Sequence, residues 1–178
     1  MTHRSDEILI VVDEDDNVVG KAPYSKVIAG KLITRGSNII ILNSLGKMFV
    51  HKRNRNLTIY GGMWDVKVGG SVGYPESYEE AAVRELREET GININEDELD
   101  FLFSTKYRSK IHNVNRKVFR IIYDGKMSLQ ESEVEEGRFI SLDEAKKIVS
   151  EGKCSPSAKE VFEEYIKLCI AEKNIQKF

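Results

Sequence analysis

The chain has 178 residues, with 27 basic and 29 acidic side chains and a formal net charge of −2 at pH 7. Because this charge is close to zero, no global field attracts the chain to nucleic acid or to an anionic membrane, and we expect neither as a partner. The length predicts one domain whose core forms without disulfides. The isolated cysteines, Cys154 and Cys169, and the lack of a visible secretory signal favour a cytoplasmic location.

Residues 1–30 predict a strand followed by a short helix. Residues 8–12 are apolar and mostly β-branched, which is typical of a strand, and the run is far too short to cross a bilayer. An acidic turn at 13–17 leads into a second apolar pair. A helix is then expected from Pro23 to Ala29, with Gly30 as its end. We interpret this region as an extension of the main domain.

The middle of the chain predicts three strands and one helix. Residues 37–42 and 47–52 flank a turn and predict a hairpin, and a short strand at 65–68 leads to Gly69-Gly70. Residues 77–90 form the clearest helix, because an apolar stripe runs along them and Gly91 follows.

The last third of the chain predicts more strands and then helices. The strands are expected at 101–107, 117–123 and 138–140, and the helices at 142–149 and 157–170. Strands, one central helix, more strands and terminal helices together predict an α/β (α+β) sandwich around a mixed sheet.

Acidic side chains gather on one face of the central helix. Glu85, Glu88 and Glu89 stand at i, i+3 and i+4, so their carboxylates emerge close together. Three like charges repel, and a hard divalent cation such as Mg²⁺ would relieve the repulsion, since it prefers carboxylate and water oxygens. A diphosphate could complete the coordination of the ion, which would polarise the phosphoryl group and activate a water.

Neighbouring residues fit the same interpretation. Glu76 and Arg84 are two helical turns apart, so they could pair and hold the preceding loop against the helix. Gly69-Gly70 allow the backbone to approach a metal ion or phosphate closely. The alternative is a solvated helix with Glu/Arg pairs, but the whole pattern from 70 to 92 is more specific than chance readily produces.

Residues 70–92 resemble the Nudix box at every specified position: Gly70-(five residues)-Glu76-(seven residues)-Arg84-Glu85-Leu86-Arg87-Glu88-Glu89-Thr90-Gly91-Ile92. The resemblance implies a Nudix-type α/β/α sandwich with a central mixed sheet, and a single Nudix domain over residues 1–178. It also implies hydrolysis of a diphosphate linkage in a nucleoside diphosphate derivative or a similar small phosphorylated metabolite. Mg²⁺ is the implied cofactor, with Mn²⁺ as an alternative, and a homodimer is expected because family members often dimerise.

The resemblance assigns roles to the residues of the box. Glu85, Glu88 and Glu89 would be metal ligands and catalytic residues, and the carbonyl of Gly70 would be a further ligand. Arg84 and Glu76 would form the structural pair.

Segments at 10–21, 62–65 and 129–134 resemble isopentenyl-diphosphate isomerases and their hydrolase-like relatives. Such isomerases carry a Cys-Gly-His-Pro stretch, where this chain has Gly69-Gly70-Ser71-Val72, and Thr34 stands in place of a second metal-binding histidine. Isomerisation needs a proton donor and acceptor on opposite sides of the allylic unit, so the sequence favours the hydrolase. A non-catalytic nucleotide-binding module of the same fold is a third interpretation, although a pure binder has no need of crowded carboxylates.

Four more side chains are candidates for the site. Glu133 would complete the metal shell or act as general base, unless it belongs to a plain acidic loop. Arg53 is predicted to bind phosphate, although such basic clusters also occur at solvated hairpin edges. Lys67 is expected to point into the cleft, because it alternates with two valines. Trp64 could stack on a base or cover an apolar tail, although the core is its more common place.

One histidine is predicted to lie outside the site. His112 falls in a polar hairpin at 110–116 and is expected to be exposed and inert.

Overall fold

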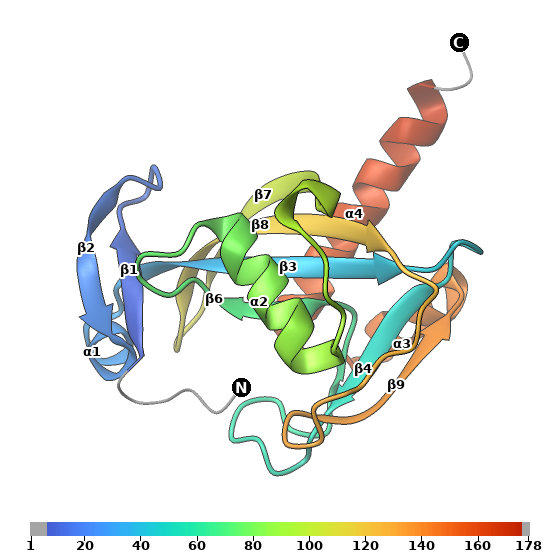
Figure 1. Ribbon diagram of the computed structural model, residues 1–178, viewed down its shortest axis with the longest axis horizontal. Coiled ribbons are helices and arrows are strands. Elements are labelled where there is room, and N and C mark those ends of the chain that lie inside the picture. The colour runs from blue at the N-terminus through green and yellow to red at the C-terminus, as the bar shows by residue number, and fades with distance from the viewer. Residues whose placement is uncertain (1–6, 176–178) are drawn as a thin grey trace.

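The computed structural model describes residues 7–175, in which nine strands form one mixed sheet with helices on both faces (Figure 1). The strands are β1 (Ile8–Val12), β2 (Val18–Pro23), β3 (Ile33–Leu42), β4 (Met48–Arg53), β5 (Trp64–Asp65), β6 (Val68–Ser71), β7 (Asp100–Arg108), β8 (Asn113–Ile122) and β9 (Val134–Ile140). The helices are α1 (Tyr24–Gly30), α2 (Tyr78–Thr90), the 3₁₀ helix η1 (Glu96–Glu98), α3 (Leu142–Ser150) and α4 (Pro156–Ile175).

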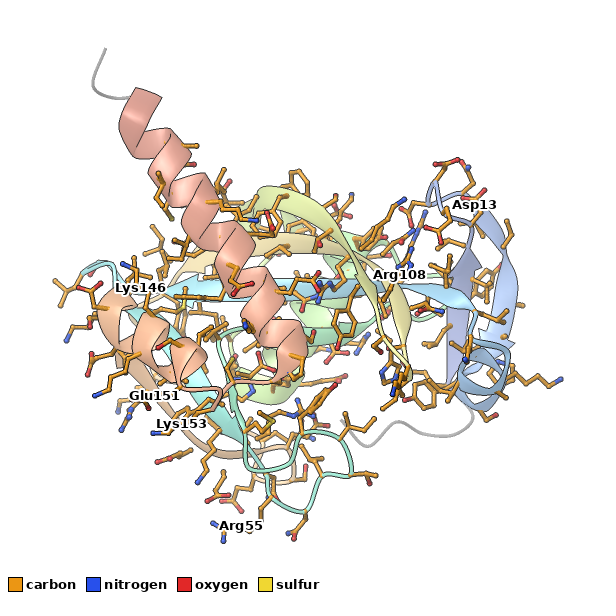
Figure 2. All side chains as sticks on the ribbon, turned by 180° about the vertical axis from the view of Figure 1, so that it is seen from behind. Asp13, Arg55, Arg108, Lys146, Glu151 and Lys153 are labelled. Atoms are coloured by element: carbon orange, nitrogen blue, oxygen red, sulfur yellow. The ribbon has the colours of Figure 1, made fainter. Side chains whose placement is uncertain are left out.

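The layers of the predicted α/β/α sandwich are confirmed. Figure 1 shows α2 crossing in front of the sheet, and the reverse view in Figure 2 shows α3 and α4 on the other face. The described strands form one continuous sheet, and the ends of the range 1–178 predicted for a single domain lie outside the described residues. No helix within residues 7–175 has the length and apolar character needed to span a membrane.

Alternation along β3 builds the core on both faces of the sheet. Ile39 packs with Leu86 of α2, whereas Ile40 packs with Phe162 of α4, and both isoleucines are fully buried. Successive side chains of a strand point to opposite faces, so a continuous apolar run is what a strand covered on both sides requires. Burial of these two clusters is the main force that holds α2 and α4 to the sheet.

The N-terminal hairpin, β1 and β2, attaches to one end of β3 through two residue pairs. The Asp13 carboxylate closes its turn by accepting hydrogen bonds from the backbone of Asp15 and Asn17, both at 2.9 Å. Figure 2 shows Arg108 of β7 beside this hairpin, where its guanidinium donates to Glu14 at 2.9 Å. The helix expected to end at Gly30 continues through it, because Lys31 takes the left-handed conformation (φ 50°) and caps the helix instead.

The prediction that β3 and β4 form a hairpin is wrong except at one residue pair. The strands meet at Leu42 and Met48 and then separate, because β6 pairs with β3 while β9 and β5 pair with β4. The predicted strand at 65–68 is likewise divided between β5 and β6. Longer ladders with distant partners outweigh the local hairpin, and the sheet therefore opens between β5 and β6, where Lys67 lies.

Helix α2 has the start and end predicted for it. Ser77 accepts a hydrogen bond from the backbone of Glu80 at 2.9 Å, and the Glu80 carboxylate accepts one from the backbone of Ser77 at 2.7 Å. This capping box satisfies two backbone donors that a helix start otherwise leaves unpaired. Gly91 ends the helix with φ 71°, which is the left-handed conformation that glycine adopts easily.

Candidate active site

Arg84 is the centre of the polar network between α2 and the loop before it. Its Nε and one terminal nitrogen donate to both carboxylate oxygens of Glu76, at 2.7 and 3.0 Å. The guanidinium also donates to the carbonyl of Ser71 at 3.0 Å and to the carboxylate of Glu85 at 2.8 Å. Glu88 lies further away, at 3.4 Å. Because the fork of a guanidinium is planar and rigid, these contacts set the position of β6 relative to α2.

Two of the carboxylates on α2 are buried. Glu85 and Glu89 are each 6% exposed, whereas the Glu88 side chain is half exposed. Burial raises the pKa of Glu85 to about 7, against the opposing effect of Arg84. Burial, followed by the charges of Glu85 and Glu133, raises the pKa of Glu89 well above its ordinary value. These carboxylates therefore repel one another where water cannot screen them.

Glu133 belongs to the turn before β9, a segment far from α2 in the sequence. Its backbone carbonyl accepts a hydrogen bond from the backbone of Asn54 at 2.7 Å, at the end of β4. Its charge acts on both Glu85 and Glu89. Residues far apart in the sequence thus place a third carboxylate beside the two buried ones.

These carboxylates fit a hard divalent cation, because Mg²⁺ and Mn²⁺ favour oxygen ligands and neutralise their repulsion. The described residues do not yet hold three carboxylate, imidazole or thiol groups in a ready metal-binding arrangement. Glu85 instead lies against Arg84. Binding an ion would therefore require Glu85 and Glu88 to exchange their contacts with Arg84 for contacts with the cation.

Strand β6 approaches β3 through glycines. Gly69 has φ 140°, and a Cβ atom placed on it would lie 2.1 Å from the carbonyl oxygen of Ser37. No side chain fits at this position. The next residue, Gly70, pairs with Ser37, and its carbonyl oxygen lies 3.4 Å from where a Cβ atom of Gly36 would be. Both Gly36 and Gly70 line a cavity, so the carbonyl proposed as a ligand lies at its wall.

This cavity has a volume of about 520 Å³ and lies on the face of the sheet that carries α4. Its floor residues Gly36, Asn38 and Arg116 alternate with residues that face α2, and Ser157 of α4 forms part of its wall. Helix α2 and its carboxylates lie on the other face of the sheet, and the charge of Lys67, between β5 and β6, acts on Glu89.

Lys67 connects the cavity to these carboxylates. It lines the cavity, and its ammonium group lies 3.8 Å from the Asp65 carboxylate. Its charge lowers the pKa of Glu89 against the larger opposing effect of burial. A cationic group at this opening can contact both a bound phosphate and the carboxylate face of α2.

The basic cluster after β4 divides into two kinds of side chain. Arg53 lines the cavity, and its buried Nε has no hydrogen-bond partner among the described residues. A buried donor without a partner costs about 1–3 kcal/mol, which favours an acceptor from a ligand. Arg55, by contrast, projects outward in Figure 2 and pairs with Glu135 at 2.6 Å.

Two sequence-based expectations differ from what the structure places at the site. Trp64 packs against the core under α4, with the guanidinium of Arg138 5.1 Å from its ring centre, and it is not among the residues that line the cavity. His112 was expected to be exposed, but it is half-buried, lines the cavity, and lies with Nε2 2.9 Å from the Tyr24 hydroxyl. The prediction for His112 is wrong, because α1 folds against the turn between β7 and β8.

Sequence reasoning missed Arg116 and Asp65. Both are 3% exposed and line the cavity. A signal was present for Arg116, since it is two residues from both Val114 and Val118 and therefore shares one face of a strand with these apolar side chains. The predicted strand begins at 117, four residues after the start of β8 at Asn113, and this leaves the arginine in a polar turn.

His51, buried near the site, predicts an acid-sensitive step in stability. It is 3% exposed, and burial, partly offset by the charge of Asp65, lowers the pKa of its imidazole to about 4. In the unfolded chain this imidazole has its ordinary pKa near 6.5, so it takes up a proton at a higher pH than in the folded protein. The free energy of unfolding therefore falls as the pH drops from about 6.5 to 4. From pH 7 to pH 5, we expect the free energy of unfolding of the His51→Leu variant to fall by about 2 kcal/mol less than that of the unsubstituted chain. Urea unfolding in EDTA at both pH values measures this, and equal losses would contradict it.

The chain is similar to known proteins both in sequence and in fold. A family model described as a NUDIX domain matches residues 32–164. A Nudix hydrolase of Pseudomonas aeruginosa is 34% identical over 159 residues, which cover 83% of this chain and 90% of the relative. An isopentenyl-diphosphate Delta-isomerase of Photorhabdus laumondii is 28% identical over 160 residues, covering 84% and 89% of the two chains. A crystal structure of a Deinococcus radiodurans protein has the same fold, with a TM-score of 0.72 and 23% identity over 89% of this chain and 98% of that one.

Proposed function

This chain belongs to the Nudix hydrolase family, and we propose that it hydrolyses the diphosphate linkage of a small phosphorylated metabolite with the help of Mg²⁺ or Mn²⁺. The observation that carries the proposal is the pair of buried carboxylates, Glu85 and Glu89, beside Glu133. Burying like charges together is costly unless a ligand compensates for it. A function that uses the cation explains why the fold keeps them.

Glu85, Glu88 and Glu89 would hold the cation, with the Gly70 carbonyl as a further ligand. When bound, the ion would polarise a phosphoryl oxygen and lower the pKa of a coordinated water. The chain itself orients the reactants: Arg84 fixes the ligand-bearing helix against β6, while Lys67 and Arg53 hold the diphosphate in the cavity. Glu133 is the candidate to accept the proton of the attacking water.

Two features support hydrolysis over the isomerase alternative. The position where the isomerase resemblance expects a cysteine is Gly69, and the carbonyl of Ser37 excludes any side chain there. Cys154 cannot replace it, because it is 5% exposed and burial raises the pKa of its thiol to about 12. A thiol with that pKa is neither a ready thiolate nor a proton donor near neutral pH.

The proposal is tested by a phosphate-release screen with Mg²⁺ or with EDTA. The panel holds nucleotide sugars, dinucleoside polyphosphates, nucleoside triphosphates and prenyl diphosphates. We expect release from at least one class with Mg²⁺, falling by at least about 100-fold after EDTA treatment, because the ion supplies several kcal/mol of charge stabilisation. Restoring Mg²⁺ should restore the rate.

Two outcomes would contradict the proposal. Conversion of isopentenyl diphosphate to an isomer of the same mass, without phosphate release, would support the isomerase. Tight nucleotide binding with no turnover at any metal concentration would support a binding module of the same fold.

A further inference from the structure

Arg116 lies at the opposite side of the cavity from the glycines of β6. Ser71, Gly36 and Arg116 are successive partners across β6, β3 and β8. Neighbouring strands are about 4.8 Å apart, so the backbones of Ser71 and Arg116 are separated by about 10 Å. Gly36 lies between them and places no side chain on the cavity floor. Val114 narrows the space above Gly36, where a Cβ atom would lie 2.9 Å from its Cγ1. Ser71, Gly36 and Arg116 nevertheless line the same cavity, so a ligand with its diphosphate at Ser71 can extend towards Arg116.

The guanidinium of Arg116 is held in one orientation. It is 3% exposed, donates to the Ser157 hydroxyl at 3.0 Å, and forms an ion pair with Glu160. It also lies over the ring of Tyr107, 4.9 Å from the ring centre. In the part of the chain that the structure describes, its buried Nε has no hydrogen-bond partner. One donor of a fixed, buried cation is thus left for an acceptor from outside the fold.

Polar and aromatic groups line the cavity near Arg116, together with the aliphatic side chains of Leu57, Ile59 and Val114. Asp65 is 3% exposed, lines the same cavity, and accepts a hydrogen bond from Ser155 at 3.4 Å. Tyr60 and Tyr107 form an aromatic part of the wall. Tyr60 has φ 56°, and a left-handed tyrosine is a strained conformation that tends to occur at functional sites.

This chemistry argues against a hydrocarbon tail as occupant. A prenyl chain would offer no hydrogen bond to the unpartnered Nε of Arg116, and a buried donor left unpaired costs about 1–3 kcal/mol. A planar ring with a carbonyl oxygen matches the groups at the Arg116 end of the cavity. It can stack on tyrosine, accept from a guanidinium, and offer an N–H to a carboxylate.

We propose that Arg116 is the residue that determines substrate specificity, with its Nε donating to a carbonyl oxygen of a planar ring, as in a uracil, cytosine or guanine nucleotide. The proposal rests on the proposed function for its placement of the diphosphate at β6. Asp65 accepts from an N–H of the same ring, and Tyr60 or Tyr107 stacks on its face. A site built around a hydrogen bond rejects analogues that lack the matching group.

Binding of monophosphates tests the proposal without requiring turnover. Isothermal titration with Mg²⁺ compares UMP, CMP, GMP, AMP, ribose 5-phosphate and geranyl monophosphate. Ribose 5-phosphate measures the phosphate end alone, and AMP carries a base without a carbonyl group. We expect at least one of UMP, CMP and GMP to bind at least about tenfold more tightly than AMP, ribose 5-phosphate or geranyl monophosphate.

Arg116→Met should abolish this tenfold preference and leave the affinity for ribose 5-phosphate unchanged. Arg116→Lys keeps a cation beside Glu160 but lacks the Nε donor, so it should lose the preference as well. The matched control is Arg120→Met on the same strand, since Arg120 pairs with Asp100 and lies outside the cavity lining. That variant should keep the preference.

The proposal is overturned if AMP or geranyl monophosphate binds most tightly, if no monophosphate exceeds ribose 5-phosphate, or if both Arg116 variants retain the preference. Failure of this proposal and failure of the proposed function give different results. An enzyme that hydrolyses a prenyl diphosphate with Mg²⁺ would keep the function and refute the role of Arg116. A protein that binds UMP through Arg116 without hydrolysing any diphosphate would do the reverse.

Discussion

Glu89→Gln is expected to lower kcat by about 10²–10³-fold and to leave the metal-free protein at least as stable as the unsubstituted chain. The rate falls because one cation ligand is lost, and the ion contributes several kcal/mol to the barrier reduction. Stability is preserved because Glu89 is 6% exposed beside Glu85 and Glu133, so its ionised form is unfavourable in the absence of metal. Removing that charge should raise the free energy of unfolding by up to about 2 kcal/mol.

Two measurements separate these effects. Steady-state kinetics with the best substrate of the screen gives kcat, and urea unfolding at pH 8 in EDTA gives the stability. Mg²⁺ should raise the melting temperature of the unsubstituted chain and have a much smaller effect on the variant.

The matched control is Glu79→Gln on the same helix, where Glu79 pairs with Lys117 at 3.0 Å. It should change neither kcat nor the response to Mg²⁺, since a partly exposed ion pair contributes little. Normal kcat in Glu89→Gln would exclude Glu89 as a ligand. A metal-free variant that unfolds several kcal/mol more easily would show instead that the carboxylate is structural.

Arg84→Met is expected to destabilise the protein by about 3 kcal/mol and to abolish activity through misplacement of β6 and α2. The substitution removes the donors to Glu76, to Glu85 and to the Ser71 carbonyl. Breaking a buried ion pair by removing one partner costs more than the pair contributes, because the remaining charge is left without compensation. Here the buried Glu85 is left in that state.

Arg84→Lys distinguishes charge from geometry. A lysine keeps the positive charge but cannot reproduce the bidentate contact with Glu76, so we expect it to recover part of the stability and little of the activity. Arg87→Met serves as the control, since Arg87 is exposed on the same helix. Urea unfolding measures the stability, and steady-state kinetics measures kcat. The network would be shown to be dispensable if Arg84→Met were as stable and as active as Arg87→Met.

The helix that carries the carboxylates was predictable because its signals are local. Ser77 and Glu80 form the capping box within one turn, and Gly91 ends the helix. The spacing of Glu85 and Glu89 places them on one face whatever packs against it. Short-range geometry of this kind can be derived from sequence. The pairing of Glu76 with Arg84 also depends on how the loop before α2 packs on the helix, because Glu76 precedes the N-cap Ser77.

The strands were predictable as elements but not as a sheet. Alternation and β-branching indicate where β3 and β4 lie, whereas their partners come from distant parts of the chain. The local hairpin was therefore predicted, and the separation of the two strands after Leu42 and Met48 was not.

The sequence by itself determined the family pattern, the caps of α2 and the grouping of its carboxylates, because these depend on spacing along one helix. Only the tertiary structure decided that the sheet opens at Lys67, that Trp64 packs against the core outside the cavity, and that Arg116 is buried at the cavity. The physical reason is that burial and hydrogen bonding are collective. Whether a charged side chain is solvated or held at a site depends on which distant strand and helix pack around it.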